Sequence, residues 1–127
     1  MLTAACVFAG LAALLHVYIF VIESLQFEKP STLRTFGVSP EHAVHMKPWA
    51  YNQGFYNLFL AIGTGTGVGV LSANRDAGVA LLCFGLGSML AAALVLVTSD
   101  SSKARAAVVQ GLFPALGLLC LLVWGLA

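Results

Sequence analysis

The chain has 127 residues, of which 60% are hydrophobic and 9% are charged, and its formal net charge at pH 7 is +1. About a quarter of the residues of a soluble domain are charged, so this composition excludes an ordinary soluble protein and favours a single domain in a lipid bilayer. The small net charge also excludes the basic surface that nucleic-acid binding requires, so we expect no nucleic-acid partner.

Four stretches free of Asp, Glu, Lys and Arg predict four membrane-spanning helices. Each has about the 20 apolar residues that cross a hydrocarbon core, and none alternates like a barrel strand. The first stretch has no Lys or Arg ahead of it, so we interpret it as a retained helix and not as a secretory signal. The expected fold is an all-α polytopic membrane protein, an antiparallel bundle of four transmembrane helices. The expected spans are 2–26, 48–72, 77–99 and 106–126.

The segment Phe27–Lys47 between the first two spans is predicted to be a long loop, and Ser39-Pro40-Glu41 is typical of the start of a surface helix within it. With four spans, the opposite side of the membrane carries only one basic residue, Arg75. The positive-inside rule therefore places the long loop in the cytoplasm and both termini in the periplasm, in the bacterial inner membrane. The basic residues on the loop side are Lys29, Arg34, Lys47, Lys103 and Arg105.

Small residues predict where helices touch. Residues 63–69 contain two overlapping GxxxG patterns, so we expect a partner helix to cross closely at Gly63, Gly65, Gly67 and Gly69. Gly85, Ser88 and Ala92 form a similar smooth stripe in the third span. Such stripes are typical of chains that associate, so we expect a homo-oligomer in contact with membrane lipids.

Two ionisable residues in the first span need an explanation, because such groups are costly inside a membrane. His16 lies well inside the span, and Glu23 follows at its cytoplasmic end. Their spacing puts both on one helical face, about 10 Å apart, where a water or a ligand can bridge them. We predict that His16 and Glu23 are catalytic and exchange protons, since a partly apolar site moves such groups toward neutral pKa values.

The second span begins with hydrogen-bonding side chains at helical spacing. Asn52 and Tyr56 stack at i, i+4, as do Gln53 and Asn57, and Gln110 enters from the same side on the fourth span. We predict that these five residues bind a ligand in a polar cavity that opens toward the cytoplasm. The alternative is that the polar groups only join helices, with Glu23 in the headgroup region and paired with Lys47.

No metal or cofactor is required by the sequence, and the cofactor is left unknown. The three cysteines lie in apolar runs, and we expect them to be small buried hydrophobes. His45, near the mouth of the expected cavity, is a candidate haem ligand, because a small four-helix isomerase of styrene oxide has a haem-binding histidine ahead of an Asn-Gly pair. The cysteines are Cys6, Cys83 and Cys120.

The segments His16–Glu23 and Asn52–Ala61 resemble a family of small bacterial integral membrane proteins known as the domain of unknown function 1304. The resemblance covers the whole chain. It implies four transmembrane helices and no established activity.

Three functions fit these observations. The first is a membrane-embedded protein that binds or isomerises a small lipophilic molecule by acid–base chemistry. The second is a proton-coupled exporter like the small multidrug-resistance transporters, whose single membrane glutamate also lies on the first helix. The third is a structural or assembly subunit without chemistry, for which the glycine stripes suffice.

Overall fold

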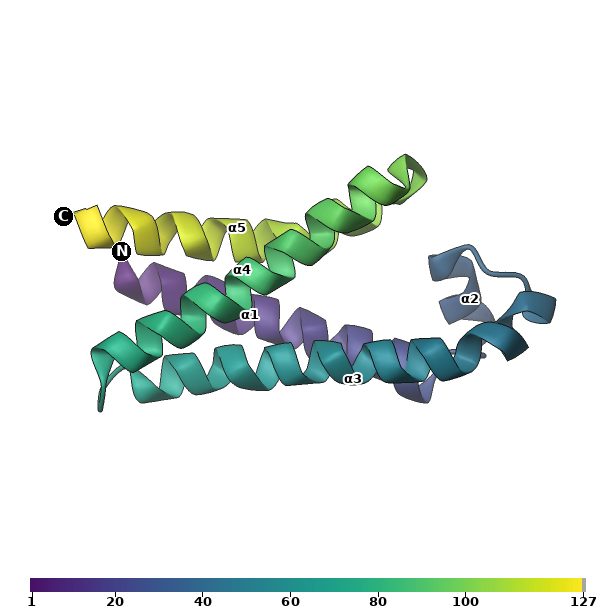
Figure 1. Cartoon of the computed structure of the whole chain (residues 1–127), viewed down its shortest axis with the longest axis horizontal. Helices are drawn as coiled ribbons and strands as arrows, with labels where there is room; N and C mark the ends of the chain where they lie inside the picture. Colours follow the sequence, from purple (N-terminus) through teal and green to yellow (C-terminus); the bar gives the residue numbers. More distant parts are fainter. Residues whose placement is uncertain (127) are drawn as a thin grey trace. The chain divides into compact units, whose positions relative to one another are not determined.

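The computed structural model describes residues 1–126, and every secondary-structure element in that range is helical, which confirms the predicted all-α class (Figure 1). The long helices are α1 (Leu2–Phe20), α3 (Pro40–Val70), α4 (Arg75–Ser99) and α5 (Ala104–Leu126). Three short elements join them: the π-helical turn η1 (Val21–Leu25), helix α2 (Pro30–Phe36) and the 3-10 turn η2 (Ser101–Lys103).

Within residues 1–126, three helical segments are long and apolar enough to cross a membrane: Leu2–Leu25, Arg75–Ser99 and Ser101–Leu126. They are consistent with a multi-pass membrane protein. Helix α3 is long enough but is not among them, because its asparagine, glutamine, glycine and threonine residues lower its mean hydropathy. The second predicted span, at 48–72, therefore stays a prediction.

The chain divides into two compact units, one formed by residues 1–15 and 60 onward and the other by His16–Phe59. In the first unit, alanines at helical spacing on α1 pack against larger side chains of α4. Alanines spaced three and four residues apart lie on one helical face, and their small size lets α4 fill the space in front of them. The buried residues of this cluster are Ala5, Ala9 and Ala12 of α1, Leu82, Leu86 and Met89 of α4, and Cys120 and Leu121 of α5.

Of the four glycines in 63–69, only Gly67 makes the expected close crossing. A Cβ on Gly67 would lie 3.1 Å from the Leu81 Cβ and 3.1 Å from the Leu82 backbone nitrogen, so α4 passes directly over it. At Gly63, Gly65 and Gly69 an added Cβ would meet nothing within 4 Å, so the prediction is wrong there. Glycines two residues apart point to nearly opposite sides of a helix, and helices that cross at an angle are closest over about one turn. In the other predicted stripe, Gly85 does pack closely, against Thr64.

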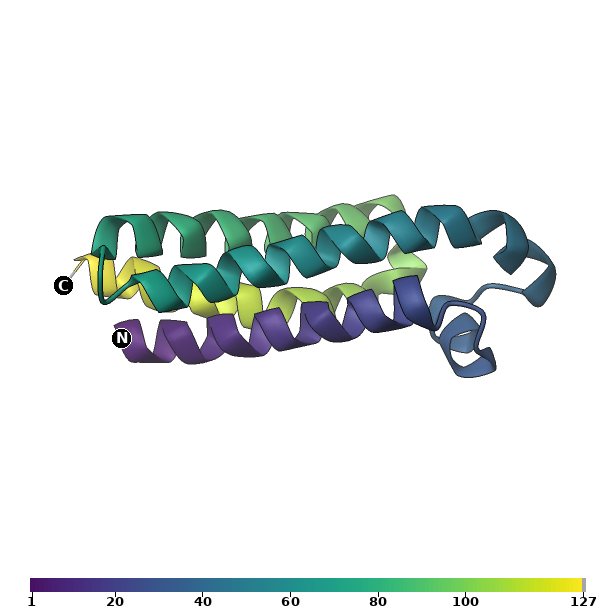
Figure 2. The same cartoon turned by 90° about the horizontal axis from the view of Figure 1, so that it is seen from below.

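Three parts of the first unit lie at the same end of that unit. The start of α1, the turn between α3 and α4 and the end of α5 lie at one end of this unit in both views (Figures 1 and 2). Asn74 in that turn begins α4, because its side-chain oxygen accepts a hydrogen bond of 3.0 Å from the Ala77 N–H.

The segment expected as a long loop is mostly helical, which corrects the prediction. Helix α2 begins at Pro30 and ends at Phe36, and the Gly37 that caps it has a positive φ of 66°, which suits a residue without a side chain. Ser39 accepts a hydrogen bond of 3.4 Å from the His42 N–H, so the predicted helix start is confirmed. The helix does not stop before Lys47, however, but continues through Pro48 to Val70 as α3. Pro48 is exposed, where the loss of one backbone hydrogen bond is tolerable.

Candidate functional site

The second unit contains the pair of polar residues that the structure brings into direct contact. Glu23 lies in the π-helical turn η1, which continues α1. A π-helical turn has i→i+5 hydrogen bonds and is found mostly as an isolated turn, frequently at functional sites. Because such a turn is wider than an α-helical one, it shifts the direction in which the following side chains point.

Asn57 of α3 holds the Glu23 carboxylate. The Asn57 Nδ2 donates one hydrogen bond of 2.9 Å to the Glu23 Oε2 and another of 3.2 Å to the backbone oxygen of Gln53. The amide has two N–H hydrogens, so these two bonds use both of them. Asn57 is 6% exposed, which makes a second orientation of its side chain costly. The contact therefore fixes one oxygen of the carboxylate.

The close approach of η1 to α3 depends on Gly54. A Cβ on Gly54 would overlap the Ser24 Oγ and would lie 3.1 Å from both the Ser24 backbone nitrogen and the Glu23 Cβ. The missing side chain lets the Ser24 hydroxyl donate a hydrogen bond of 2.7 Å to the backbone oxygen of Tyr51. Gly54 lies about one turn before Asn57 on α3, so this close approach brings Glu23 within reach of Asn57.

Aromatic rings pack against one another at the end of α1 and along α3. Phe20, just before η1, meets Phe55 edge to face with 5.1 Å between ring centroids. Tyr51 and Phe59 lie one turn to either side of Phe55, at centroid distances of 5.0 and 6.2 Å. The junction of α1 and η1 therefore meets α3 through an apolar aromatic contact, a surface that suits a lipophilic ligand better than an ionic one.

The Glu23 carboxylate can do chemistry with its second oxygen. No hydrogen bond among the described residues reaches the Glu23 Oε1, whereas Oε2 is held by Asn57. A carboxylate with one fixed and one available oxygen can accept a proton and return it without losing its position.

The other predicted site residues differ in their surroundings. His16 is fully buried, whereas Asn52, Gln53 and Tyr56 are exposed on α3. Gln53 contributes its backbone oxygen to the Asn57 contact and not its side chain. That all these residues line one cavity stays a prediction.

Two further predicted residues, Gln110 and His45, are not part of this contact. Gln110 is half-buried on α5, in the first unit, and His45 is exposed near the start of α3. Within residues 1–126, no three His, Cys, Asp or Glu side chains are grouped so that they could hold a metal ion. The three cysteines are free thiols, but only Cys120 is buried, so the expectation of burial is wrong for the exposed Cys83.

The suggested pairing of Glu23 with Lys47 is wrong. Lys47 instead forms an ion pair with Glu28, and both of those side chains are more than half exposed. Glu28 lies between η1 and α2, and Lys47 lies on the third turn of α3, which begins at Pro40.

Sequence reasoning missed Ser24, Gly54 and the π-helical turn itself. Ser24 stands directly after Glu23, and a serine at the end of an apolar run carried no separate signal. Gly54 was visible as a small residue among the polar groups of the second span. A small residue opposite a polar one was the only available hint of a close helix contact.

Comparison with known proteins gives one match. A family described as "Protein of unknown function (DUF1304)" matches residues 10–122 of the chain. Neither the curated proteins nor the solved structures include a significant match. The matched range contains Glu23, Ser24, Gly54 and Asn57, so the whole contact lies within the part of the chain that matches the family.

Proposed function

The chain belongs to the DUF1304 family, described as being of unknown function, and we propose that it binds a small lipophilic molecule in the membrane and moves a proton on it through Glu23. One observation carries this proposal. An ionisable carboxylate lies in a helix apolar enough to cross a membrane, and Asn57 holds one of its two oxygens. A carboxylate in such a place is costly and is typical of a functional site.

The chemistry that suits this site is the isomerisation of a carbon–carbon double bond. The Glu23 Oε1 takes a proton from a carbon next to the double bond, and the double bond shifts as the C–H electron pair moves. The same carboxyl group then returns a proton to the far carbon. Atoms and electrons balance within the one molecule, so no oxidant, reductant or second substrate is needed.

The ligand class follows from the surroundings of the carboxylate. Phe20 and Phe55 offer an apolar surface beside η1, and the helix that carries Glu23 is itself apolar. The molecule must therefore partition into the bilayer, and Asn52, Gln53 and Tyr56 are expected to orient its polar end. His16, two turns before Glu23, is expected to assist the proton transfer.

The topology proposed with this function has four passes in the bacterial inner membrane. In this topology the second half of α3 crosses the membrane between α1 and α4. The start of α1, the turn between α3 and α4 and the end of α5 lie at one end of the first unit, which supports this topology (Figure 2). The positive-inside rule puts that end in the periplasm and Glu23 toward the cytoplasm. A homo-oligomer in contact with lipids completes the proposal.

This function can be tested by identifying the small molecules that co-purify with the protein. Wild type, Glu23→Gln and Glu28→Gln are purified in mild detergent, and bound small molecules are identified by mass spectrometry after solvent extraction. The glutamine oxygen still accepts the Asn57 hydrogen bond, so Glu23→Gln should fold but lose ligand retention or turnover. Glu28 is an exposed carboxylate, so its variant should behave like wild type.

The structural alternative gives a different pattern. If Glu23 only joins helices, wild type carries no molecule beyond bulk phospholipid, and Glu23→Gln carries the same compounds as wild type. Either finding, with all three proteins equally stable in a thermal melt, would contradict the proposal.

A further inference from the structure

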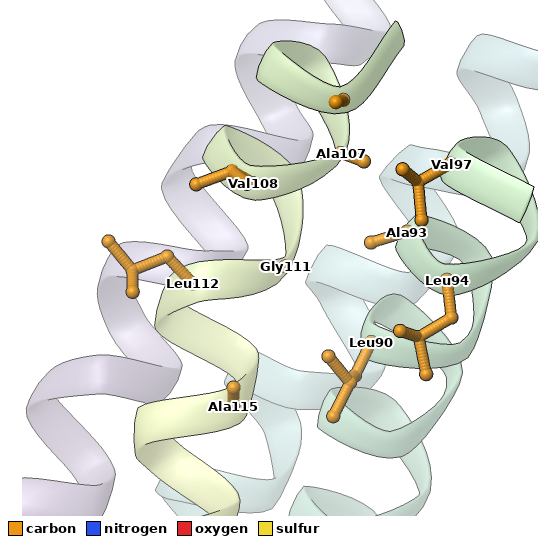
Figure 3. A pocket seen from close by; sticks show the side chains of 10 residues that line it. Leu90, Ala93, Leu94, Val97, Ala107, Val108, Gly111, Leu112 and Ala115 are labelled. Atoms are coloured by element: carbon orange, nitrogen blue, oxygen red, sulfur yellow. The ribbon is translucent and has the colours of Figure 1, made fainter. Parts of the chain in front are cut away.

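An apolar groove of about 310 Å³ runs between α4 and α5 (Figure 3). Its floor is made of small residues that are buried, and its two walls are made of larger residues that are exposed or half-buried. The floor residues are Ala93, Ala107 and Gly111. The walls include Leu90, Leu94, Val108 and Leu112, with Leu94 on one side and Val108 on the other (Figure 3).

The groove is shaped for a chain of methylene groups. Leu94, Val108 and Leu112 are 55%, 63% and 49% exposed, so their apolar sides are available to an occupant. The lining runs along α5 from Ala104 to Ala115, which is about 16 Å at 1.5 Å per residue. That length is about half of the roughly 30 Å hydrocarbon core, the depth of one leaflet.

Positive charge stands at one end of the groove. Ala104, which lines that end, lies between Lys103 and Arg105 in the sequence. The nearby carboxylate of Asp100 is engaged within the turn, where it accepts hydrogen bonds from the Ser102 hydroxyl and the Ser102 N–H. Lys103 also interacts electrostatically with the Asp100 carboxylate, so the two cations and the one anion leave a net positive charge at this end of the groove, where an acyl groove would meet lipid headgroups.

We propose that this groove is a binding site for one anionic phospholipid, with an acyl chain on Ala93, Ala107 and Gly111 and the phosphate at Lys103 and Arg105. The charge complementarity favours a lipid over a second copy of the chain. A symmetric pair that shared this groove would bring the cations of both copies into the same surface, which repels. The site is separate from Glu23, and it stands or falls independently of the proposed function.

The test uses the full chain in mild detergent and native mass spectrometry. Phosphatidylglycerol and phosphatidylcholine with the same acyl chains are titrated in turn, and the dissociation constant of the first bound lipid is measured for each. Wild type should bind phosphatidylglycerol more tightly. Each cation near a lipid surface is worth about a fivefold change in affinity, so the Lys103→Gln, Arg105→Gln double variant should lose about 30-fold in phosphatidylglycerol binding. Lys29→Gln, an exposed cation elsewhere, should lose none.

A second pair of variants tests the groove itself. Val108→Trp fills the groove from its wall and should weaken both lipids. Val95→Trp alters a valine on α4 that is equally exposed, at 65%, but does not line the groove, and it should bind as wild type does. A phosphatidylglycerol with a photoactivatable acyl chain should crosslink wild type within residues 90–97 and 104–115.

Four outcomes would overturn the proposal. They are equal affinity of wild type for the two lipids, unchanged binding in the double cation variant, equal losses in Val108→Trp and Val95→Trp, and crosslinks outside both peptides. Crosslinking needs no substitution, so it decides the question even where a variant fails to fold.

Discussion

Replacing Gly54 by alanine perturbs the contact between η1 and α3 most directly. The new Cβ would overlap the Ser24 Oγ and would stand 3.1 Å from the Ser24 backbone nitrogen. The overlap costs about 1–3 kcal/mol as overpacking. Displacing the Ser24 hydroxyl from the Tyr51 oxygen costs about 0.5–1.5 kcal/mol more, and the better helix propensity of alanine returns about 1 kcal/mol. The net loss in unfolding free energy is therefore about 0.5–3.5 kcal/mol.

The chain supplies its own controls for this change. Gly63 and Gly69 lie on the same helix, and a Cβ on either would meet nothing within 4 Å, so alanine there should leave stability unchanged or raise it. The assay is unfolding in mixed micelles, followed by circular dichroism. In a Ser24→Ala background the overlapping hydroxyl is gone, so Gly54→Ala should cost less than in wild type. If Gly54→Ala unfolds at the same denaturant concentration as Gly63→Ala, the account of this contact is wrong.

Three further predictions follow from other contacts. Gly67→Leu should destabilise the chain by more than 1 kcal/mol, on the order of an overpacked core, whereas Gly65→Leu should not, as the same unfolding assay can show. Hydrogen bonds from the Ser102 hydroxyl and N–H hold the pKa of Asp100 below its ordinary value of 3.8. The ionised carboxylate therefore stabilises the folded chain above that pH, and this stabilisation is lost as the pH falls through the lowered pKa. Thermal melts from pH 7 downward should show this loss of stability in wild type and not in Asp100→Asn. The Arg75 guanidinium lies 5.7 Å from the centre of the Trp124 ring, so Arg75→Gln should cost about 0.5–1 kcal/mol in the unfolding assay, and no measurable loss would mean that this cation–π contact does not stabilise the chain.

Much of the fold could be predicted because a membrane leaves few choices. Long runs without charge can satisfy their backbone in lipid only as helices, so the apolar runs that contain α1, α4 and α5 were visible in the sequence. The course of α3 was harder to predict. Its first turns are polar and contain Pro48, which suggested a loop, yet the helix passes through the proline because that position is exposed.

The candidate site was predictable in its residues but not in its contacts. Glu23 and Asn57 stood out because polar groups in apolar helices need a reason. Ideal α-helical spacing predicted that a water or a ligand bridges Glu23 and His16, and that bridge stays a prediction. The π-helical turn that starts at Val21 changes that spacing, and the approach of η1 to Gly54 then selects Asn57 as the partner. Neither the turn nor the helix contact follows from local residue preferences, since both depend on packing between distant segments.

Deuterium uptake by a lipophilic substrate tests the central claim most directly. Wild type, Glu23→Gln and Glu28→Gln are incubated in D₂O with the lipophilic extract of bacterial membranes, and every extracted species is compared by mass spectrometry. A proton that passes through the Glu23 carboxyl exchanges with solvent, so at least one species should gain one deuterium with wild type and with Glu28→Gln but not with Glu23→Gln. The absence of any labelled species with wild type, or equal labelling by Glu23→Gln, would contradict a role for Glu23 in proton transfer.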